Sequence, residues 1–202
     1  MSLPIDIDSV KGFLHPEEGQ ALLESAATLD SPRPAVEIGS YCGKSTVYFG
    51  VGCQQAGRKL FAVDHHQGSE EHQAGEFFHD TSLADGSGGI NSFDAFRATM
   101  RAALLTDTVL PVVTESVIFA DAWTLPVAML FIDGGHSLAA AMADYRAWAG
   151  KIEQGGLLAI HDVFPNAEDG GQAPATVYRL AIASGLFKER DSVHSLRILE
   201  RL

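Results

Sequence analysis

The sequence is short of basic residues and of long apolar runs. Of its 202 residues, 14 are Lys or Arg and 26 are Asp or Glu, so the formal net charge is −12. Surfaces that track nucleic-acid phosphates or anionic lipids need clustered Lys and Arg, so both kinds of partner are disfavoured. No apolar run approaches the ~18 residues that cross a bilayer. The first eight residues also lack the basic and apolar regions of a signal peptide, and we expect a cytoplasmic protein.

Cysteine is nearly absent, and the two that are present do not suggest a disulfide. Cys42 and Cys53 flank a predicted helix, which would separate their Cα atoms by roughly 16 Å at ~1.5 Å per residue. A disulfide requires less than ~7 Å. We therefore expect two reduced thiols in a chain that is long enough to bury a core without staples.

Strand-like apolar segments alternate with amphipathic helical segments, which indicates βαβ units. The predicted strands are residues 35–39, 60–64, 109–114, 127–133, 156–162, 187–190 and 195–199. The predicted helices are residues 15–28, 44–54, 92–105, 116–123, 137–148 and 173–184. We predict a single α/β domain over residues 1–202, with a Rossmann-like, doubly wound, mostly parallel seven-stranded sheet and helices on both faces. Residues 1–34 would be a helical extension of it.

Residues 37–45, EIGSYCGKS, form a glycine turn between a predicted strand and a predicted helix. The dinucleotide fingerprint G-x-G-x-x-G needs a glycine where this chain has Tyr41. A phosphate loop, G-x-x-x-x-G-K-S/T, needs one more residue between Gly39 and Gly43. An acid before the turn also repels phosphate, and Glu37 suits a cationic amino-acid group instead.

This turn resembles the first motif of the class I S-adenosylmethionine-dependent methyltransferases: an acid, any residue, glycine, three residues and glycine. The second motif of that family is an acid after the next strand, which hydrogen-bonds the ribose hydroxyls, and Asp64 matches it. The resemblance implies S-adenosyl-L-methionine as the cofactor. The cofactor site that it implies consists of Glu37, Gly39, Ser40, Tyr41, Gly43, Ser45, Asp64, Ser116 and Asp133.

Residues 130–137, LFIDGGHS, and 155–162, GGLLAIHD, extend the resemblance. They are similar to the fourth and fifth strand motifs of small bacterial sugar and natural-product O-methyltransferases, including those of mycobacterial methylmannose polysaccharide assembly. Metal-dependent members have an Asp after the fourth strand and an acidic pair after the fifth. The resemblance implies a divalent ion, Mg²⁺ or Mn²⁺, on Asp133, His161 and Asp162, with His161 standing where an acid is usual.

A hydroxyl acceptor ionises far above neutral pH, so its methylation needs a general base or a metal. The metal-dependent relatives have an acidic base two residues beyond the strand-four Asp, where this chain has Gly135. We predict that the neighbouring His136 is the base, since His is the commonest residue in that role. Asp133 and His161 complete the predicted catalytic set. The alternatives are that Asp133 and Asp162 only cap turns and contact cofactor, and that His136 is an ordinary loop histidine.

Residues 65–93 contain no Lys or Arg but hold five acids and four of the eight histidines, His65, His66, His72 and His79. Structureless connections of this length are usually lids, binding loops or disorder. We predict a substrate lid with Phe77 and Phe78 as anchors, and a solvated insertion is the alternative. A zinc site made by these histidines is disfavoured, because their spacing matches no known ligand framework.

These patterns predict an O-methyltransferase that methylates a sugar or glycoside hydroxyl with metal assistance. The acceptor would be a small molecule or an oligosaccharide, and a homodimer is compatible with the sequence. An alternative acceptor is a phenol or small natural product, walled by Tyr41, Phe77, Phe78 and Trp123. A second alternative is a protein that binds the cofactor without turnover. A nicotinamide dehydrogenase is disfavoured by the missing middle glycine.

Overall fold

The computed structural model describes residues 3–68, 81–84, 86, 89–135 and 137–202, and these form a seven-stranded sheet in the order β3-β2-β1-β4-β5-β7-β6. The strands are β1 (Ala35–Ile38), β2 (Leu60–Val63), β3 (Val109–Val112), β4 (Val127–Ile132), β5 (Ile152–Ile160), β6 (Phe187–Val193) and β7 (Leu196–Arg201). Strands β1 to β5 pair in parallel, and β7 runs antiparallel to both β5 and β6. The predicted fold class is confirmed, although β5 begins earlier and β6 ends later than expected.

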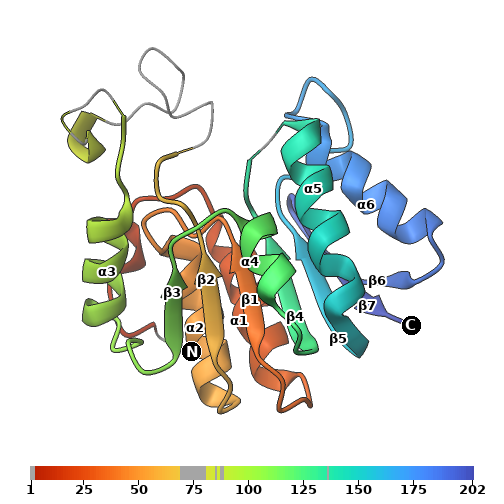
Figure 1. Ribbon diagram of the computed structural model, residues 1–202, viewed down its shortest axis with the longest axis horizontal. Helices are drawn as coiled ribbons and strands as arrows, with labels where there is room; N and C mark the ends of the chain where they lie inside the picture. The colour runs from red at the N-terminus through yellow and green to blue at the C-terminus, as the bar shows by residue number, and fades with distance from the viewer. Residues whose placement is uncertain (1–2, 69–80, 85, 87–88, 136) are drawn as a thin grey trace.

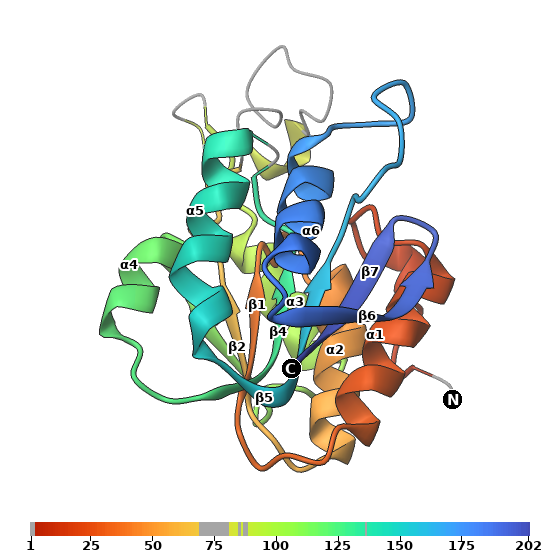
Figure 2. The ribbon, with the colours of Figure 1, turned by 90° about the vertical axis from the view of Figure 1, so that its right-hand side faces the viewer.

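Helices cover both faces of this sheet (Figures 1 and 2). One face carries α1 (Pro16–Thr28), α2 (Lys44–Gln55) and α3 (Phe93–Ala102), and the other carries α4 (Ser116–Ala122), α5 (Leu138–Trp148) and α6 (Ala173–Ala183). Strand β4 is buried along its whole length, with Met129 and Phe131 in one core cluster and Leu130 and Ile132 in the other. An uninterrupted apolar run is what a central strand covered on both faces requires.

Helix α1 is packed into the core rather than lying at its edge. A capping box starts it: the Glu17 amide donates to Nδ1 of His15, and the His15 amide donates to Oε2 of Glu18. Leu22 and Leu23 are fully buried against α2. This packing brings the first turn of α1 close to the end of β5, where it takes part in the site described below.

The sheet reverses its winding between β1 and β4, the position at which open α/β sheets bind ligands. Gly39 follows β1 with a φ of +86°, and a Cβ there would lie 2.1 Å from the Asp133 carbonyl oxygen. Only glycine allows the two strand ends to approach so closely.

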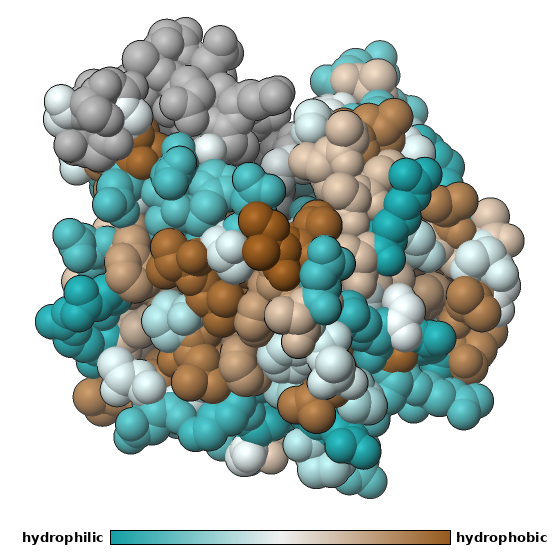
Figure 3. Space-filling model, in the orientation of Figure 1, coloured by the Kyte–Doolittle hydropathy of each residue, from teal (hydrophilic) through white to brown (hydrophobic). Residues whose placement is uncertain are grey.

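Apolar side chains gather near the middle of the face that Figure 3 shows, where β3 and α4 lie in Figure 1. The exposed apolar residues of these two elements and the loops after them are Leu110, Val113, Ile118 and Leu125.

The predicted homodimer stays a prediction. Among the described residues, no helix is both long enough and apolar enough to cross a membrane.

Candidate active site

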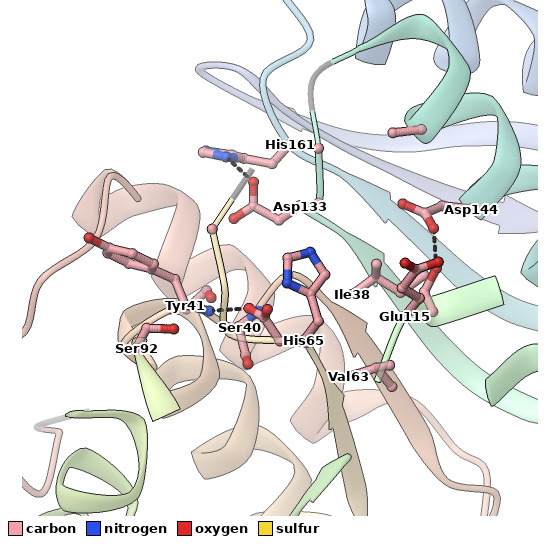
Figure 4. Close-up of a pocket in the computed structure, with 18 of the residues that line it drawn as sticks. Ile38, Ser40, Tyr41, Val63, His65, Ser92, Glu115, Asp133, Asp144 and His161 are labelled. Atoms are coloured by element: carbon pink, nitrogen blue, oxygen red, sulfur yellow. Dashed lines mark hydrogen bonds and ion pairs between the residues drawn. The ribbon is translucent and has the colours of Figure 1, made fainter. Parts of the chain in front are cut away.

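A cavity of about 500 Å³ opens at the carboxyl ends of β1, β2 and β4 (Figure 4). This volume lies in the range of small-molecule sites. Residues 11–14 form one wall of the cavity. The predicted cofactor residues that line it are Gly39, Ser40, Tyr41, Ser45, Asp64, Ser116 and Asp133.

Asp64 lines the cavity and also fixes the glycine turn. Its Oδ2 accepts hydrogen bonds from the backbone amides of Ser40 and Tyr41 at 2.9 and 2.8 Å, and its Oδ1 accepts from the His66 amide at 2.7 Å. The Oγ of Ser40 is buried at the cavity with no hydrogen-bond partner among the described residues. Buried hydroxyls normally have a partner, so this one points to a ligand.

Two predicted cofactor residues, Glu37 and Gly43, do not line the cavity. The Glu37 carboxylate is fully buried and accepts from Ser45 Oγ at 2.7 Å and Thr46 Oγ1 at 2.6 Å. Burial raises the pKa of Glu37 to about 8. Gly43 precedes α2 in a left-handed conformation. The Gly43 amide closes the turn by donating to the Ser40 carbonyl at 2.8 Å. Glu37 binds hydroxyls of α2 and lies outside the cavity, which corrects the direct contact with a cationic group that we expected for it.

The wall beside Ser116 contains an acid that sequence reasoning did not assign to the site, Asp144. Ser116 Oγ donates to Asp144 Oδ1, and burial raises the pKa of Asp144. Asp144 shares one face of α5 with Ala140 and Ala143, which also line the cavity. The sequence signal that could have indicated this residue was a single acid, Asp144, on an alanine-rich face of α5 (Leu138–Trp148).

The structure brings Asp133, His161 and Asp162 together, as predicted. His161 Nδ1 lies 2.9 Å from Asp133 Oδ1 and 3.5 Å from Asp162 Oδ1. One ligand atom from each of the three lies within 4.8 Å of the others, so they can share one ion. Asp133 and Asp162 are partly exposed while His161 is only 4% exposed, so an ion here would sit at the edge of the cavity.

The other nitrogen of His161 meets an acid that sequence reasoning missed, Glu18 of α1. Nε2 of His161 lies 3.0 Å from Glu18 Oε2. Burial alone would lower the pKa of His161, but the adjacent Asp133 and Glu18 carboxylates raise it to about 11. The same imidazole, together with Ser195, lowers the pKa of the buried Glu18 to about 2. The sequence placed Glu18 only within the predicted helix of residues 15–28.

Several predicted residues lie elsewhere or outside the described residues. His136, Phe77, Phe78, His72 and His79 fall outside them, so the base and the lid remain predictions. His65 lines the cavity, and His66 is buried with Nδ1 2.8 Å from Ser92 Oγ. The prediction that Trp123 forms part of the acceptor wall is wrong. Trp123 packs in the core against Phe61 and Trp148, because its ring completes an aromatic cluster.

Comparison with known proteins gives the family. The model of a methyltransferase domain family matches residues 36–163, most of the chain, so the chain belongs to that methyltransferase family. This confirms the family predicted from the glycine turn and the strand-end acids.

Solved structures with the same fold include an O-methyltransferase from Bacillus cereus in complex with SAH, with a TM-score of 0.65 and 16% identity over 94% of this chain and 83% of that one. An SAH-bound methyltransferase from Podospora anserina gives a TM-score of 0.67 and 11% identity over 94% and 80%. The O-methyltransferase NovP gives 0.60 and 18% over 92% and 78%. At these identities the likeness establishes the fold alone.

Proposed function

We propose that this methyltransferase uses S-adenosyl-L-methionine and methylates a hydroxyl oxygen of a sugar or glycoside. The observation that carries the proposal is that one cavity is lined both by the glycine turn with Asp64 and by the cluster of Asp133, His161 and Asp162. In the transfer, the acceptor oxygen attacks the methyl carbon, the carbon–sulfur bond breaks, and the electron pair stays on sulfur. The hydroxyl proton leaves to a base, for which His136 is our candidate.

The cofactor assignment follows from hydrogen-bond capacity. Of the roughly four acceptor sites on the Asp64 carboxylate, backbone amides use three, so one site on Oδ1 is left to accept from a ribose hydroxyl. Ser40 and Ser45 line the cavity at the turn. The Ser40 hydroxyl, which has no partner among the described residues, can bind the amino-acid end of the cofactor, whereas the Ser45 hydroxyl already donates to Glu37. Ser116 and Asp144 lie together at another wall, and the Asp144 carboxylate can accept from an adenine amino group.

A divalent ion fits the Asp133, His161, Asp162 cluster. Two carboxylates and an imidazole suit Mn²⁺ or a similar borderline ion better than Mg²⁺, which prefers oxygen ligands. Such an ion would lower the pKa of an acceptor hydroxyl. His161 has one nitrogen directed at Asp133 and the other at Glu18, so it is placed to bind and orient rather than to receive the acceptor proton.

A phenolic acceptor is the second candidate. The Phe13 side chain is 65% exposed at the cavity wall and stacks with Tyr41 at a centroid distance of 6.4 Å. Aromatic rings pack well in such offset arrangements, and a phenol would extend the stack. Sugars also lie flat on aromatic rings, so an acceptor panel must contain both classes.

The deciding experiment measures methyl transfer from labelled S-adenosyl-L-methionine to sugars, glycosides and phenols, with product identification by mass spectrometry. We expect turnover that EDTA abolishes and Mn²⁺ or Mg²⁺ restores. Full turnover in excess chelator would remove the metal from the proposal. Cofactor binding by calorimetry without turnover on any acceptor would favour the non-catalytic alternative.

A further inference from the structure

We propose that Glu18, which does not line the cavity, positions His161 as a metal ligand. The Glu18 carboxylate would do so by accepting a hydrogen bond from the Nε2–H of His161. The inference rests on the metal role proposed above and names the residue that orients His161 for that role. Glu18 would thus connect the first turn of α1 with the chemistry at the end of β5.

The geometry around the imidazole leads to this assignment. An ion can bind Nδ1 only by displacing the proton from that nitrogen, so the one proton that the ring keeps must sit on Nε2. Nδ1 faces Asp133 and Asp162, and Nε2 faces Glu18 Oε2 at 3.0 Å. Ligating histidines generally donate their second N–H to a carboxylate or carbonyl, which fixes the tautomer and the ring plane.

Glu18 is itself held by the turn between β6 and β7. Its Oε1 accepts from the Ser195 amide and Ser195 Oγ, both at 2.8 Å, and from the Leu196 amide at 3.1 Å. Its Oε2 also accepts from the His15 amide at 3.1 Å, and the residue is 2% exposed. A buried carboxylate with these donors cannot rotate away, so the ring is oriented before an ion arrives.

Substitution by glutamine separates positioning from folding. In Glu18→Gln the amide oxygen can keep the bonds from Ser195 and Leu196, which turns the NH₂ group toward His161. This orientation loses the bond from the His15 amide, so thermal unfolding of the variant is measured beside metal binding. An NH₂ group only donates, so Nε2 must accept and the imidazole proton moves to Nδ1, where it blocks metal binding. The matched control is Glu24→Gln, which removes the same charge from the same helix at an exposed position where Glu24 accepts from Gln20 Nε2.

The test measures Mn²⁺ binding by calorimetry and by electron paramagnetic resonance. We expect Glu18→Gln to weaken Mn²⁺ binding about 10- to 100-fold, the usual effect of losing such a partner. Glu24→Gln should bind Mn²⁺ as the wild type does, and both variants should keep the cofactor dissociation constant. Any Mn²⁺ held by the exposed group His15, Glu17 and His194 is common to the wild type and both variants. Wild-type-like Mn²⁺ binding by Glu18→Gln overturns the role of Glu18. Absence of Mn²⁺ binding by the wild type overturns the metal role itself and leaves methyl transfer to be judged by turnover.

A second measurement needs no variant and covers the case in which Glu18→Gln does not fold. Nitrogen-15 NMR of the wild-type histidines with Zn²⁺ bound reports which imidazole nitrogen carries the proton. We expect His161 to be protonated on Nε2 and ligated through Nδ1. Ligation through Nε2, or a proton on Nδ1 in the zinc-bound protein, overturns the proposal.

Discussion

Carboxylates at the strand ends of this protein differ in role because their surroundings differ. Asp64 lines the cavity and has one acceptor site left on Oδ1, whereas Glu37 does not line it and has both oxygens bonded to hydroxyls. The resemblance to the family's first and second motifs implied that both contact the cofactor. What the sequence does not show is the direction of each side chain, and that direction is set by the hydroxyls and amides that fold around it.

Replacing Asp64 tests the cofactor assignment. Asp64→Ala removes the acceptor for a ribose hydroxyl and also two bonds that hold the turn. Losing a hydrogen bond to a charged group costs roughly 1.5–3 kcal/mol, so the cofactor dissociation constant should rise about 10- to 150-fold. Titration calorimetry checks this, with exposed Asp121→Ala on α4 as the control. An unchanged constant would show that Asp64 only supports the turn.

Glu37 should make stability fall as pH rises. Its pKa is raised from 4.5 to about 8 in the folded chain, so between these values the folded state holds a proton that the unfolded state has released. The wild type should therefore lose stability relative to Glu37→Gln from about pH 5 to pH 8. Denaturant unfolding of both proteins across this range measures the difference. Parallel curves would mean that Glu37 is ionised in the folded protein.

At the scale of elements, local pattern predicted nearly every helix and strand. Periodicity and glycine turns are local signals, and they specified the parallel strands and the loop at the end of β1. Strand-end position also brought Asp133, His161 and Asp162 together correctly, because parallel strands end at one edge. Glu18 could not be found this way, since its partners His161 and Ser195 lie 143 and 177 residues along the chain.

Gly39 in the glycine turn and Gly57 after α2 are both left-handed, and they differ in the space that an added Cβ would have. Gly39 and Gly57 have φ values of +86° and +68°, but a Cβ meets the Asp133 backbone only at Gly39 and nothing within 4 Å at Gly57. Gly57→Ala should cost about 1–2 kcal/mol of stability and leave cofactor binding intact. Gly39→Ala should in addition weaken cofactor binding by at least about tenfold, equivalent to 1.4 kcal/mol. Thermal unfolding and calorimetry measure both, and equal behaviour of the two variants would contradict the close approach.

For the whole molecule, the cofactor should act as a stabilising ligand. At a concentration 100 times its dissociation constant, a ligand of the folded state adds about 2.7 kcal/mol. For a chain of this size that corresponds to a rise of roughly 5–10 °C in the unfolding midpoint. Asp64→Ala should retain at most about half of the free-energy gain at the same concentration. An equal midpoint with and without cofactor would argue against its binding in the described cavity.

The contact between Glu18 and the turn at Ser195 also sets an order of events during synthesis. Contacts between distant parts of a chain form after local ones, because closing a long loop costs more entropy. While the ribosome is still making β7, the glycine turn and Asp64 are already available, but Glu18 has no Ser195 or Leu196 to hold it. The contacts that hold Glu18 against His161 are therefore completed only after Ser195 and Leu196 have been made, later than the hydrogen bonds between Asp64 and the glycine turn.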